Sequence, residues 1–301
     1  MSLIEKVIEK VAKSTAQGRV DLGVDSPSGE RVRVARPDPA ENDLQAVVPG
    51  DSKRSKVVKL DTVMMTSKGL ILPETGFTRT AEEYRRIKHP ILRRAFDGDK
   101  PKNVIMVTSS VPNEGKTFCA INLAISIAME LDRTALLIDL DIAKNGVSSA
   151  LGLEVKAGVV DVLITERSVN LHDVMLKTSI SKLTVLPAGT KDFNISELYS
   201  SQGMVDLMNE LSERYQDRVI IIDSPPIAST SEARVLLDLV DQIVFVVEAE
   251  KTSQHLVAES LESIDKTKLT GVILNKTNQR VVADSYYGSY GGQGAQDQVL
   301  G

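Results

Sequence analysis

The spacing of hydrophobic positions changes along the chain, and these changes divide it into four segments. An apolar stripe with helical spacing near the amino terminus predicts an amphipathic helix over residues 1–13. Residues 14–56 show no sustained apolar period and hold prolines, glycines and many charges, which predicts a flexible linker. Residues 57–278 carry aliphatic runs and are expected to form one domain, whereas the glycine-rich residues 279–301 are expected to be a disordered tail.

Short aliphatic runs alternate with amphipathic stretches from residue 103 onward. Runs without alternating polar residues indicate strands that are buried on both faces, as in a parallel sheet. The helical patterns between them indicate right-handed strand–helix–strand crossovers. The predicted fold is therefore an α/β domain with a doubly wound, mostly parallel sheet. Its predicted strands are residues 104–108, 135–139, 183–187, 218–223, 242–247 and 270–275.

A phosphate-binding loop is predicted directly after the first of these strands. Residues 110–117 read SVPNEGKT, which has the spacing of a P-loop with serine in place of the first glycine. Lys116 would reach the β- and γ-phosphates of ATP, and the Thr117 hydroxyl would bind Mg²⁺. Backbone N–H groups of such a loop hold phosphates. The fold is thus expected to be of the P-loop NTPase type, because the loop follows a strand and precedes a helix. The expected nucleotide contacts are Ser110, Val111, Pro112, Asn113, Glu114, Gly115, Lys116, Thr117 and Phe118.

Three aspartates lie at the ends of two apolar strands. In a doubly wound sheet, the carboxyl ends of the strands face the ligand crevice. Asp139 and Asp141 are two positions apart and so point to the same face, although one of them could instead cap the following helix. Asp223 ends an apolar strand in the manner of a Walker B aspartate. Lys116 and the three aspartates are expected to be catalytic, with Thr117, Asp141 and Asp223 holding Mg²⁺.

Composition and charge argue against several other classes of protein. The net charge of −5 disfavours a general nucleic-acid binder. The single cysteine, Cys119, can form neither an internal disulfide nor a zinc cluster, and we expect it to be a small buried helix residue. No stretch reaches the ~20 apolar residues of a membrane helix, which predicts a cytoplasmic protein. Two interpretations of the first helix stay open: it docks on a partner or a membrane surface, or it folds back on its own domain.

The tail is notable for its tyrosines. Half of the six tyrosines of the chain lie in it, flanked by glycines: Tyr286, Tyr287 and Tyr290. Tyrosines in a flexible, exposed segment are accessible to a kinase site in a neighbouring copy of the chain. We expect them to be phosphate acceptors, and a tail without chemistry is the alternative.

The P-loop, the aspartate pair and the strand IIDSPP together resemble the bacterial tyrosine kinases of exopolysaccharide export. The resemblance covers about residues 57–284 and includes LPAG, which ends the stretch 158–189. The opening MSLIEKVIEKV and the stretch EEYRRIKHPIL resemble the exosortase-associated autokinases, which lack membrane helices of their own. The resemblance implies a head-to-tail homo-oligomer, a membrane-embedded polysaccharide co-polymerase as activator, and a tyrosine phosphatase. It implies a location peripheral to the inner membrane through that activator.

The resemblance also assigns an assembly motif and an altered Walker motif. The family's Glu-x-x-Arg-x-x-Arg matches Glu82, Arg85 and Lys88 on a charged helix predicted over residues 81–95. Lys88 replaces the last arginine and lacks its forked geometry. The family's Asp-x-Asp-x-Arg matches the aspartate pair but has Ala143 at the arginine position, with a lysine next to it.

A protein-tyrosine autokinase is the function that these features predict. A tyrosine hydroxyl would attack the γ-phosphate in line, with Asp139 as the base and Asp141 positioning Mg²⁺ or its waters. The resemblance suggests that Asn275 contacts the adenine, with a strand-capping role as the alternative.

The alternative function is a switch ATPase of the chromosome-partition and division-site type. Such proteins carry an early lysine in KGGxGK, whereas this chain reads SSVPNEGK, with no lysine before Lys116. A nucleotide-binding scaffold without catalysis ranks last, because all the Walker carboxylates are present.

Overall fold

The domain that follows residue 56 is the part of the molecule described below. The computed structural model describes residues 57–277 except 76–77, 165–168, 191–194 and 215–216. The predicted first helix, the linker and the tail with Tyr286, Tyr287 and Tyr290 lie outside the described residues.

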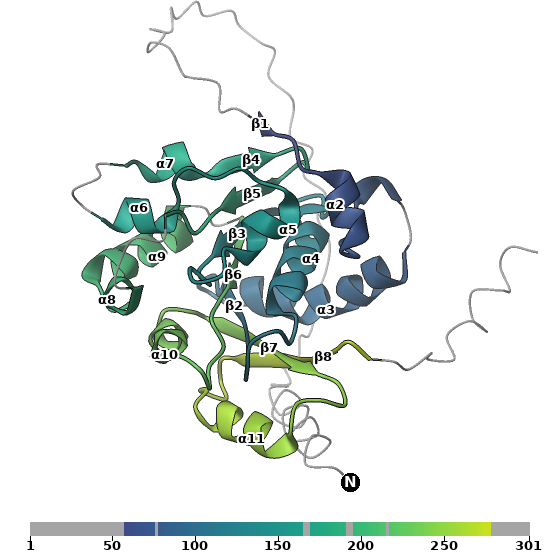
Figure 1. Cartoon of the computed structure of the whole chain (residues 1–301), viewed down its shortest axis with the longest axis vertical. Coiled ribbons are helices and arrows are strands. Elements are labelled where there is room, and N and C mark those ends of the chain that lie inside the picture. Colours follow the sequence, from purple (N-terminus) through teal and green to yellow (C-terminus); the bar gives the residue numbers. More distant parts are fainter. Residues whose placement is uncertain (1–56, 76–77, 165–168, 191–194, 215–216, 278–301) are drawn as a thin grey trace, which may run out of the picture. The chain divides into compact units, whose positions relative to one another are not determined.

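An eight-stranded sheet forms the centre of this domain (Figure 1). Its strand order is β1-β4-β5-β3-β6-β2-β7-β8, and neighbouring strands are parallel except for β4 and β5. The prediction of a doubly wound, mostly parallel sheet is confirmed. The strands are β1 Val57–Val58, β2 Val104–Ser109, β3 Thr134–Asp139, β4 Leu176–Thr178, β5 Leu183–Leu186, β6 Arg218–Asp223, β7 Gln242–Glu248 and β8 Leu269–Asn275.

The predicted strands all occur, each within one residue of its expected ends. They are easily recognised because the central strands are buried almost throughout, so their sequences are continuous apolar runs. The two strands that were not predicted, β1 and β4, are short and partly exposed. Their sequences, VV and LKT, therefore hold no run long enough to stand out.

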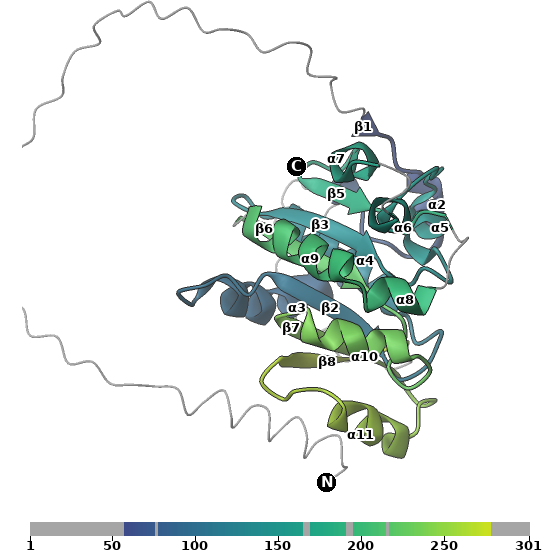
Figure 2. The same ribbon diagram turned by 90° about the vertical axis from the view of Figure 1, so that its left-hand side faces the viewer.

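Helices cover both faces of the sheet, with α9 and α10 on one side and α3 and α4 on the other (Figure 2). All but two of the 13 residues of α4 are buried, which explains why its sequence is apolar on every side. The helices are α2 Thr62–Ser67, α3 Arg79–Phe96, α4 Lys116–Ala128, α5 Gly146–Leu151, α6 Val159–Leu163, α7 Leu171–Val174, α8 Ile195–Tyr199, α9 Gln202–Arg214, α10 Ser231–Asp238 and α11 Gln254–Glu262, with a 3₁₀ turn, η1, at Pro73–Thr75.

The charged helix α3 is slightly longer than predicted. The Thr78 side chain caps it by accepting a hydrogen bond of 3.1 Å from the N–H of Ala81. Pro90 lies inside the helix without ending it. Within the described ranges, no helix is both long enough and apolar enough to span a membrane.

Candidate active site

The predicted phosphate-binding loop joins β2 to α4, at the edge of the sheet where the parallel strands end. Asn113 and Gly115 have positive φ angles of 70° and 97°, a conformation that turns the chain sharply into the helix. A Cβ atom on Gly115 would lie 2.0 Å from Nδ2 of Asn275. Glycine is therefore required at this position both by its backbone conformation and by the close approach of β8.

The buried carboxylate of Glu114 braces the loop from inside. It accepts hydrogen bonds from the N–H of Val111 at 2.7 Å, the N–H of Glu248 at 3.2 Å and the hydroxyl of Thr252. Glu114 was predicted as a nucleotide contact, and the structure shows that its side chain stabilises the loop. Glu248 and Thr252 were missed, because they lie 134 and 138 positions away in the sequence.

The tip of the loop is held by side chains from two other segments. Nζ of Lys144 donates to Oδ1 of Asn113 at 2.9 Å, and Nζ of Lys276 donates to the backbone oxygen of Asn113 at 2.7 Å. Nδ2 of Asn275 donates to the backbone oxygen of Glu114 at 2.9 Å. Asn275 thus supports the loop from the end of β8, and its contact with adenine stays a prediction.

The side chains of Lys116 and Asp141 form a buried ion pair. Their Nζ and Oδ2 atoms are 3.3 Å apart, and both side chains are almost fully enclosed. This pair brings the segment after β3 into contact with the start of α4, as the strand-end argument predicted. The phenolic hydroxyl of Tyr199, on α8, donates to the backbone oxygen of Leu140 and holds the same segment from the other side. Tyr199 was not singled out in the sequence.

Asp139 is fully buried, and both of its carboxylate oxygens are used. Oδ1 accepts a hydrogen bond from the N–H of Asp141 and Oδ2 from the N–H of Val147, each at 3.1 Å. Val147 is in the first turn of α5, so the capping alternative considered for the aspartate pair applies to Asp139. Burial, and then the charge of Asp223, raise the pKa of Asp139 well above its ordinary value.

Asp223 lies beside Asp139 in the register of the sheet and is also fully buried. Neither of its carboxylate oxygens accepts a hydrogen bond from the described part of the chain. Burial raises the pKa of Asp223 to about 7, against the opposing influence of the nearby Thr117 hydroxyl and the Lys116 charge. An unpartnered carboxylate inside a protein is costly unless a cation or a donor binds it.

These residues fit a Mg²⁺ ion that is shared with a nucleotide. The bare Asp223 carboxylate and the adjacent Thr117 hydroxyl are the oxygen ligands that Mg²⁺ prefers, with the rest supplied by water and phosphate. In the described ranges, no group of three or more His, Cys, Asp and Glu side chains could hold a metal.

Comparison with known proteins identifies the family. The model of the AAA domain matches residues 102–279. Over 213 residues the chain is 33% identical to tyrosine-protein kinase YwqD of Bacillus subtilis (strain 168), a match that covers 70% of this chain and 86% of YwqD. The chain belongs to the bacterial tyrosine kinases. It is a protein-tyrosine kinase with a nucleotide-binding P-loop domain.

Two further similarities place this tyrosine kinase among its relatives. It is 31% identical over 235 residues to the succinoglycan biosynthesis transport protein ExoP of Rhizobium meliloti (strain 1021), covering 76% of this chain and 29% of ExoP. Among solved structures, the chimerical protein CapA2B2 matches with a TM-score of 0.63 and 29% identity, covering 70% of this chain and 91% of that one.

The residues predicted to form the assembly motif are divided between the surface and the interior. Glu82 and Arg85 lie partly exposed on α3, 3.7 Å apart as an ion pair. Lys88 is buried, and its Nζ donates to the backbone oxygen of Ser126 at 2.8 Å and pairs with Glu130 at 2.5 Å. The three matched residues therefore do not share one exposed side of the helix, because Lys88 is buried. Two steps of three residues rotate the side chain by about 120° around a helix, which carries Lys88 toward α4.

The remaining predicted residues of the kinase site fall into three groups. Ser110 is buried, and its hydroxyl lies 3.1 Å from that of Ser260 on α11. Val111 and Pro112 are more accessible, at the outer part of the loop. The ring of Phe118 packs edge-on against Tyr84 of α3, with ring centres 6.3 Å apart. Phe118 therefore contributes its ring to the packing of α3 on α4.

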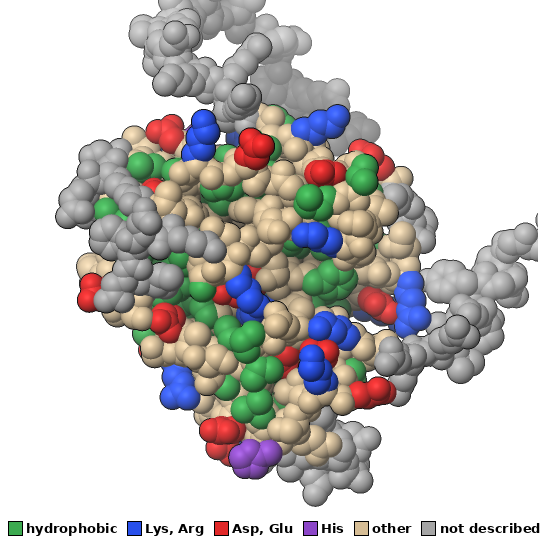
Figure 3. Space-filling view, in the orientation of Figure 1, with side chains coloured by type: hydrophobic (Ala, Val, Ile, Leu, Met, Phe, Trp, Pro, Cys, Tyr) green, Lys and Arg blue, Asp and Glu red, His purple; other side chains and the backbone are tan. Residues whose placement is uncertain are grey.

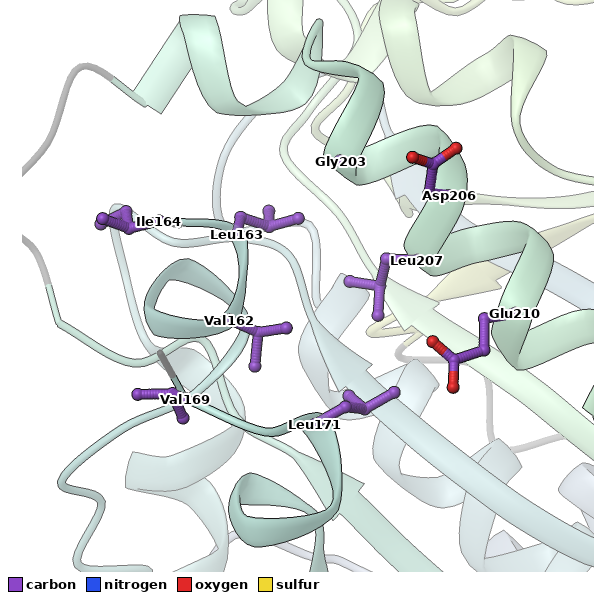
Figure 4. A pocket seen from close by; sticks show the side chains of 9 residues that line it. All are labelled: Val162, Leu163, Ile164, Val169, Leu171, Gly203, Asp206, Leu207 and Glu210. Carbon is purple, nitrogen blue, oxygen red and sulfur yellow. The ribbon is translucent and has the colours of Figure 1, made fainter. Parts of the chain in front are cut away.

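The surface of the kinase carries interspersed charges and a hollow that lies away from the predicted site residues. Charged side chains of both signs are interspersed on the face in Figure 3, without a broad field of one sign. A hollow of about 350 Å³ lies among α6, α7 and α9 (Figure 4), with Asp206 and Glu210 among its mainly apolar lining residues. None of the predicted site residues lines this hollow.

Proposed function

We propose that this tyrosine kinase transfers the γ-phosphoryl group of ATP to Tyr286, Tyr287 and Tyr290 in the tail of a neighbouring copy. The observation that carries the proposal is the bare, buried carboxylate of Asp223 beside the phosphate-binding loop. Asp223 and Thr117 would hold Mg²⁺, which supplies positive charge to the phosphate oxygens when bound. A site with these groups is equipped for phosphoryl transfer.

Lys116 and Asp141 would separate when the nucleotide binds. Lys116 then reaches the β- and γ-phosphates, and Oδ2 of Asp141 loses its ion-pair partner and becomes free. During transfer, the tyrosine oxygen bonds to the γ-phosphorus while the bond from that phosphorus to the bridging oxygen of ADP breaks. The hydroxyl proton passes to a carboxylate of the site.

Asp141 is better placed than Asp139 to take that proton. Both oxygens of Asp139 are occupied by backbone N–H groups, and its side chain is fully buried. Asp141 has one oxygen without a hydrogen bond from the described residues, next to Lys116. We therefore assign the base role to Asp141, and to Asp139 the task of holding the backbone that carries it.

The cellular role follows from the family resemblance and from the relatives. A kinase of this type would act in the cytoplasm at the inner membrane, regulate exopolysaccharide synthesis and export, and be activated by a membrane-embedded co-polymerase. Each tail phosphate adds about −1.5 to −2 charges, so fully modified tails would repel one another around a ring. A phosphatase would then restore the assembled state.

A mixing experiment tests transfer to the tail of another copy. One full-length variant, Lys116→Met, keeps the tail but loses the phosphate-binding charge; the other carries phenylalanine at Tyr286, Tyr287 and Tyr290. Neither should gain phosphotyrosine alone with ATP and Mg²⁺, whereas the mixture should label the tail of the Lys116→Met chain. The sites are read by mass spectrometry.

The same experiment separates the proposal from its rivals. Undiminished phosphotyrosine in the phenylalanine variant alone would show that the tail is not the main acceptor. ATP-dependent assembly with no phosphotyrosine in the mixture would favour the switch ATPase. Labelling of wild type but not of the mixture would show transfer within one chain. Light scattering of the phenylalanine variant should show an oligomer that persists with ATP.

A further inference from the structure

A small hollow lies beside the start of the phosphate-binding loop, in the segment that joins β6 to α10. Its volume is about 250 Å³, and its lining is residues 227–231 and Arg234. The N–H of Ile227 donates to the oxygen of Ser109 at 2.8 Å, and the N–H of Ala228 donates to the oxygen of Ser110 at 3.1 Å. The hollow therefore adjoins the loop that holds the phosphates, on the segment that follows Asp223.

Arg234 is the cation of this hollow and is free to bind a ligand. Its side chain is exposed and makes no hydrogen bond or ion pair with the described residues. The lysines around the loop are already engaged: Lys116 with Asp141, Lys144 with Asn113, and Lys276 with Glu248 and Asn113. A guanidinium in this position suits a carboxylate, which it can bind through two parallel hydrogen bonds.

The acceptor segment offers one matching group. Between residues 278 and 290 the acidic residue is Asp284, two positions before Tyr286 and three before Tyr287. Two to three extended residues span about 7–11 Å, and the hollow adjoins the phosphate-binding loop through the hydrogen bonds of Ile227 and Ala228. On the face in Figure 3, charges of both signs are interspersed, without a broad basic field that would attract any acidic segment.

We propose that the hollow at residues 227–231 and Arg234 is an acceptor-recognition site that binds Asp284 of a neighbouring copy. With Asp284 held there, Tyr286 or Tyr287 is presented to the γ-phosphate, while Tyr290 lies too far along the chain to use the same anchor. Arg234 is thus a specificity-determining residue, and modification starts at the tyrosine pair. This inference rests on the proposed transfer to the tail.

The test uses full-length chains with separate enzyme and acceptor. The enzyme carries the three tail phenylalanines, with or without Arg234→Glu, and the acceptor is the Lys116→Met chain, with or without Asp284→Arg. Arg234→Glu should raise the KM for the wild-type tail roughly two- to fivefold, as expected for an exposed ion pair, with ATP affinity unchanged. Pairing Arg234→Glu with Asp284→Arg should restore the KM, whereas Asp284→Arg with the Arg234 enzyme should remain poor.

Controls keep the outcomes apart. Lys266→Glu makes the same charge reversal on an exposed residue before β8, at the opposite edge of the sheet, and should leave the KM unchanged. If no enzyme labels the wild-type tail, the proposed function fails. If Arg234→Glu labels it as well as the parent enzyme does, or if the double reversal does not rescue, the acceptor-recognition site is overturned while transfer to the tail stands.

Discussion

The ends of β3 and β6 lie side by side, and each carries a buried aspartate. The two carboxylates differ in their hydrogen-bond partners. Asp139, at the end of β3, has both oxygens bonded to backbone N–H groups. Asp223, opposite it in the register, has neither oxygen bonded to a described residue. Identical side chains at equivalent positions thus have different roles, because one is satisfied within the fold and the other is left for a ligand.

This difference separates two kinds of polar residue in the domain. A satisfied group such as Asp139 stabilises the fold, and its loss leaves donors unpaired. A buried group without partners, such as Asp223, is expected to lower the stability of the fold, and we propose that it serves to bind a ligand. The comparison predicts that substitutions at the two positions will have opposite signatures in activity and in stability.

The largest effect is expected for Asp223→Asn. Phosphoryl transfer should fall on the order of 10²- to 10³-fold, because the substitution removes the negative charge that holds Mg²⁺. The thermal midpoint should stay constant or rise, because a buried group without partners has lost its charge. Calorimetry and phosphotyrosine rates measure the two quantities, with the exposed Asp238→Asn as control. A clear fall in the midpoint would contradict the view that Asp223 is bare for function.

The next effect is a loss of stability in Asp139→Ala. The N–H groups of Asp141 and Val147 would lose their acceptor inside the protein, which should cost about 2–4 kcal/mol of the free energy of unfolding. Asp139→Asn keeps one acceptor oxygen and should cost about half as much. Urea unfolding provides the measurement. If Asp139→Asn keeps full stability but loses all phosphoryl transfer, Asp139 rather than Asp141 is the base.

Helix α3, on which the assembly motif is predicted, offers a smaller contrast, between the buried Lys88 and the exposed Arg85. Lys88→Met should lower the free energy of unfolding by about 1–3 kcal/mol, because it leaves the backbone oxygen of Ser126 and the carboxylate of Glu130 without their donor. Arg85→Ala should change that free energy by less than about 0.5 kcal/mol, yet shift the protein toward monomer in light scattering. An oligomer that survives Arg85→Ala and dissolves in Lys88→Met would reverse this assignment.

The smallest effect concerns Cys119, whose burial lowers the reactivity of its thiol. Burial raises the pKa of this thiol to about 12, so the thiolate is scarce at every pH below that value. The native protein should therefore react very slowly with a thiol reagent at pH 8, and about tenfold faster at pH 9, which is still far slower than an exposed thiol. The unfolded protein in urea should react promptly. Fast labelling of the native chain at pH 8 would contradict the packing of α4.

Sequence reasoning worked where one local pattern determines the structure, and stopped where distant residues meet. Continuous apolar runs located β2, β6 and β7, and the loop spacing located Lys116 and Thr117. The three-residue strand β4, LKT, carries no such pattern. The buried state of Lys88 depends on where α4 lies, and the contacts of Glu114 come from the far end of the chain.

The aspartates show the same limit most clearly. The sequence indicated that Asp139, Asp141 and Asp223 gather at one edge of the sheet, because strand periodicity and topology determine which edge they reach. Which carboxylate has its oxygens occupied depends on two backbone N–H groups, those of Asp141 and Val147, whose positions follow from the turn into α5. The Asn145-Gly146 pair marks that turn in the sequence, but it does not reveal where these two N–H groups lie.

The bond from Asn275 to Glu114 has a consequence for how the kinase is made. The two residues are 161 positions apart, so the loop acquires support from the final strand of the domain. Chains are synthesised from the amino terminus, and domains generally fold as units. A ribosome-bound chain that has not yet released β8 holds the loop sequence without the finished loop. A nascent copy therefore lacks the finished loop until the last strand of the domain has left the ribosome.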